Sequence, residues 1–167
     1  MEHQVTIAEI KRAEKFHSIL LFDFIVIHVF LFVLGLGFIK SSLLPLALMP
    51  IISIALLGFV LLKAQQAKAQ ETSYFVLCHT LLAAKRARLF LLLFLITGTF
   101  TAIMLFGGTQ LGISKITSYS LAFGIGQLPF MVALLALVVM EYDASHQCKS
   151  GKIPSAGVAL NPVPAEG

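Results

Sequence analysis

The chain has 167 residues, of which 58% are hydrophobic and 12% are charged, and its formal net charge at pH 7 is +4. Soluble globular domains carry about 25% charged residues, so this composition excludes an ordinary soluble fold and favours a membrane protein. The basic excess does not favour nucleic-acid binding, because the Lys and Arg residues lie at the ends of long apolar stretches rather than on a predicted soluble face.

The N-terminal segment predicts one helix that begins outside the membrane and then crosses it. Thr6 and Glu9 have the spacing of a capping box, and neither Gly nor Pro interrupts the chain from there to Gly35. Residues 18–39 are long enough for a first span, which needs about 20 residues. A secretory signal peptide is the alternative, but the apolar run exceeds the usual length of about 7–15 residues and no small-residue cleavage site follows it.

This first span contains two ionisable residues, Asp23 and His28. A rise of about 1.5 Å per residue puts Asp23 about 7–8 Å deep and His28 about 15 Å deep, near the middle of a core about 30 Å thick. Five residues of α-helix separate the two side chains by about 140° around the axis, so the sequence predicts that they do not form a direct pair. Ionisable residues in a span are functional candidates by default, and we expect each to find a partner on another helix or a water molecule.

The second predicted span covers residues 43–62 and continues as a helix into a basic segment. Pro50 lies inside this span and predicts a kink that serves packing. Residues 63–70 are Ala, Gln and Lys, which favour a helical extension into the cytoplasm. After a turn at residues 71–73, residues 74–88 either lie on the membrane surface or continue the third span inward. The lack of Gly and Pro in the following stretch favours continuation.

The third and fourth predicted spans cover residues 89–106 and 116–140. Each contains two small residues four positions apart, a spacing that permits close approach of two helices. These helix-packing pairs are Gly98 with Ala102 and Ser120 with Gly124. Gln127 is the third polar candidate within a span, and Pro129 predicts a bend just after it. Because Gln127 lies within about one helical turn of the depth of His28, we predict a hydrogen bond between their side chains.

The distribution of Lys and Arg sets the predicted topology. Ten of the 12 basic residues lie on the side of the two termini and the central basic segment, and only Lys40 and Lys115 lie on the other side. Because Lys and Arg are retained inside, both termini are expected in the cytoplasm, with the chain in the inner (plasma) membrane. The sequence therefore predicts an all-α membrane protein, an up-down bundle of four transmembrane helices with cytoplasmic helical extensions. It forms one domain over residues 1–148, followed by a disordered tail over residues 149–167.

Motifs for metal or haem binding are weak. Four residues near the predicted inner side offer metal-ligand atoms: Cys78, His79, His146 and Cys148. They lack the paired spacing of zinc sites, so we expect no metal. Haem ligation by two histidines would need a second deep histidine besides His28, and hence a homodimer or a partner's ligand. We therefore expect no cofactor.

Catalytic motifs are equally weak. Three residues near the end of the fourth span could act as an acid–base set: Glu141, Asp143 and His146. At a membrane edge such residues are more typical of a solvated boundary, so we expect neither catalytic residues nor an enzyme.

Two classes of function remain. The first is a non-enzymatic accessory, assembly or scaffold subunit of a membrane complex. The second is a small oligomeric proton-coupled transporter that uses His28 and Asp23. A single four-span bundle leaves little room for a solute path, so the second class requires oligomerisation. The expected partners are the lipid bilayer and another membrane protein or a second copy of this chain, and not nucleic acid.

Overall fold

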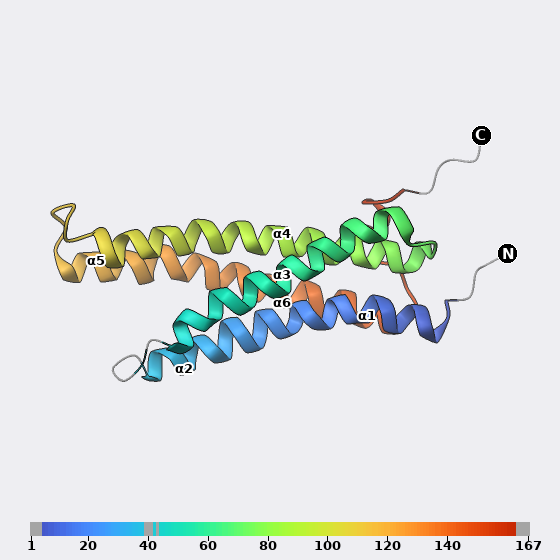
Figure 1. The fold of residues 1–167 in the computed structure, drawn as a ribbon, viewed down its shortest axis with the longest axis horizontal. Coiled ribbons are helices and arrows are strands. Elements are labelled where there is room, and N and C mark those ends of the chain that lie inside the picture. Colours follow the sequence, from blue (N-terminus) through green and yellow to red (C-terminus); the bar gives the residue numbers. More distant parts are fainter. Residues whose placement is uncertain (1–4, 39–41, 43, 163–167) are drawn as a thin grey trace. The chain divides into compact units, whose positions relative to one another are not determined.

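The computed structural model of the protein describes residues 5–38, 42 and 44–162, and every regular element in these ranges is a helix (Figure 1). Within the same ranges, four helical stretches are long and apolar enough to cross a membrane, by length and composition. They are Ile7–Gly35, Leu48–Gln70, Tyr74–Gly107 and Lys115–Lys149. The prediction of an all-helical chain with four such helices is therefore confirmed.

The chain divides into two compact units. The first unit combines residues 1–88 with residues 138–167, and the second unit comprises residues 89–137. Two long helices, α4 (Tyr74–Ala102) and α6 (Leu128–Lys149), each contribute one part to each unit.

The first unit begins with one long helical segment, as predicted. It consists of α1 (Ile7–Leu21), the π-helix η1 (Phe22–Phe30) and α2 (Leu31–Phe38), which follow one another without a break. The predicted capping box is confirmed, because the Thr6 N–H group donates to Glu9 Oε2 at 2.8 Å and the Glu9 N–H group donates to Thr6 Oγ1 at 3.3 Å. The wider turn of η1 changes which residues share a face, since its hydrogen bonds join residues five positions apart.

The helix α3 (Leu44–Gln70) returns alongside this first segment and contacts α1, η1 and α2 (Figure 1). It continues past the predicted end of the second span, as the composition of residues 63–70 indicates. A short non-helical link over residues 71–73 precedes α4, which then runs unbroken from Tyr74 to Ala102. This continuity agrees with the prediction that residues 74–88 continue the third span.

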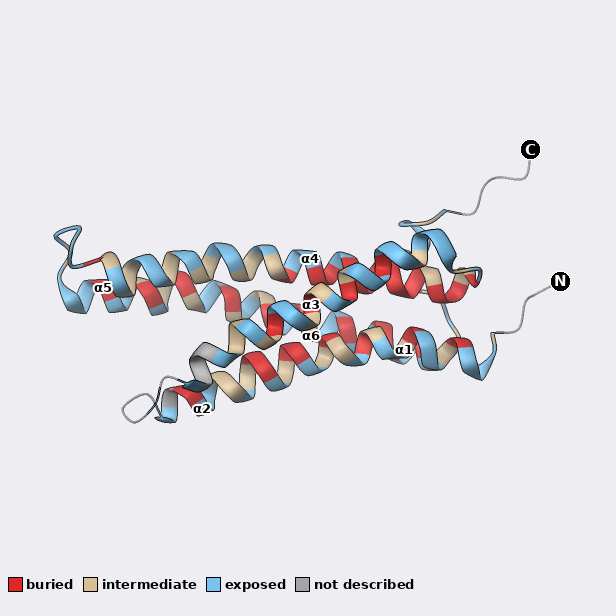
Figure 2. Cartoon of the chain, in the orientation of Figure 1, coloured by how far each residue is buried: buried red, intermediate tan, exposed pale blue. Residues whose placement is uncertain are grey.

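The start of α4 packs into the first unit through an apolar cluster. Phe75 and Val76 are buried against Ala13 of α1 and Cys148 of α6. Figure 2 shows buried positions along one side of α1, whereas residues 78–84 near the start of α4 are all buried. These contacts join α1, the start of α4 and the end of α6.

The structure differs from the disordered tail predicted from residue 149 onward. The helix α7 (Ser155–Val158) follows a turn after α6, and Gly157 packs so closely against Cys78 that an added Cβ would lie 3.2 Å from the Cys78 carbonyl oxygen. The Tyr74 hydroxyl donates to the Asn161 carbonyl oxygen at 2.9 Å. Composition alone predicted disorder because the segment has no apolar period, but Pro154 and Gly157 are buried, and Gly157 lies against Cys78 of α4. Residues 163–167 of that prediction lie outside the described residues.

The second unit contains the rest of α4, the π-helix η2 (Ile103–Gly107), α5 (Lys115–Leu121), the π-helix η3 (Ala122–Gln127) and the start of α6. Its core is aromatic: the Phe90 ring lies 6.2 Å from the Phe94 ring and 5.5 Å from the Phe130 ring, measured between centroids. Pro129, where the sequence predicts a bend, is the second residue of α6 and follows directly after the π-helical turns of η3.

Close helix approach in the second unit occurs at a different glycine from those predicted. A Cβ atom added at Gly126 would collide with Thr101 Oγ1, whereas one added at Gly98 or Gly124 would meet no described atom within 4 Å. Ala102 and Ser120, the partners of those two glycines in the predicted pairs, are both exposed. No close contact is thus shown at these positions among the described residues of the second unit, and the packing role of the two pairs stays a prediction.

Candidate functional site

His17 lies on the face of α1 that points into the first unit. It belongs to a stripe of fully buried residues, Ala13, His17, Leu20 and Phe24, whose spacing of three or four places them on one side of the helix. Both nitrogens of its ring contact other side chains. Nδ1 lies 2.5 Å from Glu141 Oε1, and Nε2 lies 2.9 Å from His79 Nδ1. His17 therefore links α1 to both α6 and α4.

Glu141 is fully buried on α6 and binds two partners, one through each carboxylate oxygen. Arg86 of α4 donates from Nη1 to Glu141 Oε2 at 2.7 Å, while Oε1 faces His17. The Arg86 side chain is itself only 9% exposed. Removing one partner of such a buried ion pair typically costs about 3–5 kcal/mol, because the other charge is left uncompensated. This contact therefore fixes the register of α4 against α6.

His79 completes the chain of hydrogen bonds through its outer nitrogen. Its Nε2 atom lies 3.0 Å from the backbone oxygen of Lys152. The end of α6 places that oxygen: Gly151 has a φ of 68°, a conformation that glycine adopts without strain. The Gly151 N–H group donates to the Cys148 oxygen and the Lys152 N–H group donates to the Gln147 oxygen, which together make a Schellman turn.

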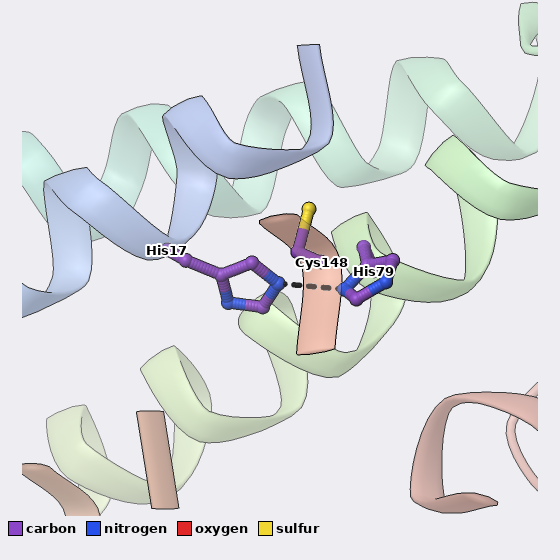
Figure 3. Close-up of side chains that lie close together, drawn as sticks. All are labelled: His17, His79 and Cys148. Carbon is purple, nitrogen blue, oxygen red and sulfur yellow. Dashed lines mark hydrogen bonds between the residues drawn. The ribbon is translucent and has the colours of Figure 1, made fainter. Parts of the chain in front are cut away.

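Cys148 brings a sulfur atom next to the two histidines. Its Sγ atom and one ring nitrogen from each of His17 and His79 all lie within 4.8 Å of one another. Figure 3 shows the three side chains converging from α1, α4 and α6, with the contact between His17 Nε2 and His79 Nδ1 drawn as a dashed line. All three residues are buried. We call them the His–Cys group; imidazole and thiolate are the ligands that proteins use for zinc and copper.

Asp23 and His28 form a second buried polar group in the first unit, and here the sequence prediction was wrong. His28 Nδ1 lies 3.8 Å from Asp23 Oδ1 and donates to the Asp23 backbone oxygen at 3.0 Å. The prediction assumed an α-helix, but the π-helical geometry of η1 brings residues five apart onto the same face. Ser53 of α3 donates to Asp23 Oδ2 at 3.1 Å, so the expected partner for Asp23 on another helix is present.

The other predicted polar residues do not join either group. Glu141, Asp143 and His146 make no common acid–base set, because Glu141 is buried whereas the other two are exposed. Asp143 instead accepts a hydrogen bond from Gln147 Nε2 at 2.7 Å. Gln127 ends η3 in the second unit, and its pairing with His28 stays a prediction.

Of the four possible metal ligands predicted from the sequence, two lie together in the structure and two do not. The structure brings His79 and Cys148 together and adds His17, which the sequence had placed only in the polar start of the first helix. His146 is exposed, and Cys78 is buried against Gly157 instead. The spacing of His17 from Leu20 and Phe24 was the available signal, since it puts the histidine on the apolar face of its helix. Nothing in the local sequence showed which residues would face it.

Comparisons with known proteins provide no template for this site. Searches against protein-family models, curated proteins and solved structures find no match to the chain.

Proposed function

We propose that the protein is an integral protein of the inner (plasma) membrane with both termini in the cytoplasm. The four long helices would then alternate in direction, and residues 63–70 and 74–88 would form cytoplasmic extensions. The ten-to-two distribution of Lys and Arg supports this orientation. An open pocket of about 360 Å³ is lined by Lys15 and Lys63 and by the ion pair of Arg12 with Glu71, and the two lysines favour the anionic headgroups of the cytoplasmic leaflet.

Labelling of introduced cysteines tests this topology. The native thiols at Cys78 and Cys148 are both buried and give little background. Lys68 and Thr109 are exposed and lie on opposite sides of the proposed membrane. A membrane-impermeant maleimide added to intact cells should label Thr109→Cys, and should label Lys68→Cys only after the cells are opened. Labelling of Lys68→Cys in sealed cells would overturn the orientation.

We further propose that the protein is a non-enzymatic accessory, assembly or scaffold subunit of a membrane complex. The observation that carries this proposal is that two buried charged side chains, Arg86 and Glu141, bind each other. Arg86, Glu141 and the two histidines form one connected set across three helices, an arrangement that stiffens the first unit. Exposed apolar residues and the uncovered glycines Gly98 and Gly124 leave the helix surfaces free for a partner helix or lipid (Figure 2).

The mass of the protein extracted in mild detergent tests this role. An accessory subunit should migrate in a complex much larger than the 18.1 kDa chain and should co-purify with other membrane proteins. Leu substituted for Gly98 or Gly124 should disrupt that complex while leaving the chain folded, because neither position contacts described atoms of its own chain. Recovery of the protein only as a monomer would contradict the accessory role.

A second candidate function, proton-coupled transport by an oligomer, is favoured by the group of Asp23, His28 and Ser53. These residues place a carboxyl group, an imidazole and a hydroxyl together inside an apolar helix pair, and π-helical turns often occur at functional sites. Recovery as a homodimer would favour this candidate. Proteoliposomes with a trapped pH dye should then show proton flux that Asp23→Asn abolishes and the exposed control Asp143→Asn leaves unchanged.

A further inference from the structure

Hydrogen bonds on the outer sides of the two histidine rings fix where their hydrogens lie. One carboxylate oxygen of Glu141, Oε2, accepts from the Arg86 guanidinium, and the other, Oε1, faces His17 Nδ1, which donates to it. The Lys152 carbonyl oxygen can only accept, so His79 Nε2 must donate to it. A neutral imidazole has one N–H group and one lone pair, and in each ring the N–H group is already placed.

The inner nitrogens of the two rings therefore both present lone pairs. His17 Nε2 and His79 Nδ1 lie 2.9 Å apart, a distance at which two lone pairs repel each other. A positive species between them removes this repulsion. A proton would do so by making one ring cationic, which adds a net positive charge to a buried site where Glu141 is already neutralised by Arg86. A metal ion would do so by binding both lone pairs.

We propose that the His–Cys group of His17, His79 and Cys148 is a binding site for one soft transition-metal ion, with Cu⁺ as the best match and Zn²⁺ as the second. Thiolate and imidazole are the ligand types that both ions accept. On binding, the Cys148 thiol loses its proton to solvent, and the metal–sulfur bond takes its place. The thiolate then balances the charge of Cu⁺, so that the buried site gains no net charge.

The surroundings of the His–Cys group match those of protein metal sites. Metal-binding histidines usually donate their second nitrogen to a carboxylate or a backbone carbonyl, which orients the ring and raises its basicity. His17 has the carboxylate of Glu141 and His79 has the carbonyl of Lys152. Zn–N bonds of about 2.0–2.1 Å at a tetrahedral angle separate two nitrogens by about 3.3–3.4 Å. The rings need to open by about 0.5 Å to admit the ion.

Metal binding at this site is independent of the accessory role proposed above. It would also bind the start of α4 to α1 and to the end of α6, because the three ligands come from those three helices. The ion would thus stabilise the same end of the first unit that the Arg86–Glu141 pair holds.

The test uses the full chain without a histidine tag, purified in detergent and stripped of metal with a chelator. Cu⁺ under reducing conditions, or Zn²⁺, is added against a competing chelator, and bound metal per chain is measured by elemental mass spectrometry. We expect one ion per chain. Cys148→Ser and His79→Gln should weaken binding by more than 10-fold, and Glu141→Gln by about 10- to 100-fold through loss of ring orientation.

Two matched controls separate this site from other cysteines and histidines. Cys78→Ser removes the other buried thiol, and His146→Gln removes an exposed histidine near Cys148, and neither should change the affinity. Metal that stays bound in Cys148→Ser and His79→Gln would overturn the proposal, as would an affinity that falls only in the controls.

Cobalt spectroscopy of the unaltered chain tests the proposal without relying on variants that could unfold. Co²⁺ in the site should give a sulfur-to-cobalt charge-transfer band, because Cys148 is a ligand. Absence of this band together with absence of Cu⁺ and Zn²⁺ binding would overturn the proposal. An imidazolium signal from His17 or His79 in nitrogen NMR would then identify a shared proton as the positive species.

Discussion

The two units of the chain bury different kinds of side chain. All but one of the buried polar and charged residues in the described part of the chain lie in the first unit, and the exception is Ser118. The second unit is instead held by the rings of Phe90, Phe94 and Phe130 and by the contact of Gly126 with Thr101. The difference matters in a membrane, where apolar side chains gain little by leaving lipid and association depends on close packing and hydrogen bonds.

Directional contacts also specify more than packing does. A hydrogen-bonded ion pair such as Arg86 with Glu141 is satisfied in one register only, whereas phenylalanine rings tolerate small shifts. The first unit therefore has one defined arrangement of polar side chains. In the second unit, the surfaces around Gly98 and Gly124 have no close neighbour among the described residues. Four substitutions with decreasing expected losses of stability test this contrast.

Glu141→Ala should destabilise the protein most, by about 3–5 kcal/mol, because it leaves Arg86 buried without its partner and His17 without its acceptor. Thermal unfolding in detergent, followed by circular dichroism, measures the loss. The control Asp143→Ala lies two residues away on the same helix but is exposed, and should change the free energy of unfolding by less than about 0.5 kcal/mol. Equal losses for the two substitutions would show that the buried contacts of Glu141 do not contribute to the free energy of unfolding.

Phe90→Ala should destabilise the second unit by about 3 kcal/mol, since the ring is fully buried against Phe94 and Phe130 and its removal leaves a cavity. Leu92→Ala on the exposed side of the same helix should have little effect, because Leu92 is 56% exposed. The same unfolding measurement applies. A clearly larger loss of stability for Phe90→Ala than for Glu141→Ala would contradict the prediction that the buried ion pair contributes more to stability than the aromatic core.

Gly126→Ala should cost about 1–3 kcal/mol, because the added methyl group collides with Thr101 and forces the two helices apart. Gly98→Ala provides the control, as its methyl group meets no described atom of the chain and alanine is the better helix former. We expect the control to unfold at the same temperature as the native protein or slightly above it. If both substitutions are neutral, close approach at Gly126 does not stabilise the second unit.

Ser53→Ala should have the smallest effect, about 0.6 kcal/mol, the average for a hydrogen bond between helices in a membrane protein. It removes the side-chain hydrogen bond from Ser53 of α3 to Asp23 and leaves the His28 contact within η1 in place. The exposed Ser18→Ala on α1 serves as its control. A loss of several kcal/mol would mean that the Asp23 group, and not the cluster around Glu141, anchors the first unit.

Much of the fold was predictable because it depends on local properties of the sequence. Runs of apolar residues predicted four long helices, the Thr6–Glu9 spacing predicted the start of the first one, and the lack of breakers predicted the continuous α4. The candidate site was predicted only in part. The sequence identified His79 and Cys148 as possible ligands but grouped them with their sequence neighbours His146 and Cys78. In the structure, the third member of the group is His17.

The all-helical architecture, the number of long apolar helices and the asymmetry of basic charge are local properties, since each follows from composition and from spacing along one helix. Two features required the three-dimensional structure: the contacts of His17 with Glu141 and His79, and the position of Asp23 beside His28. The first depends on contacts between residues 62 and 124 positions apart, which no local pattern encodes. The second depends on the wider turn of a π-helix, which moves residues five apart onto one face and which the sequence pattern of an apolar helix does not reveal.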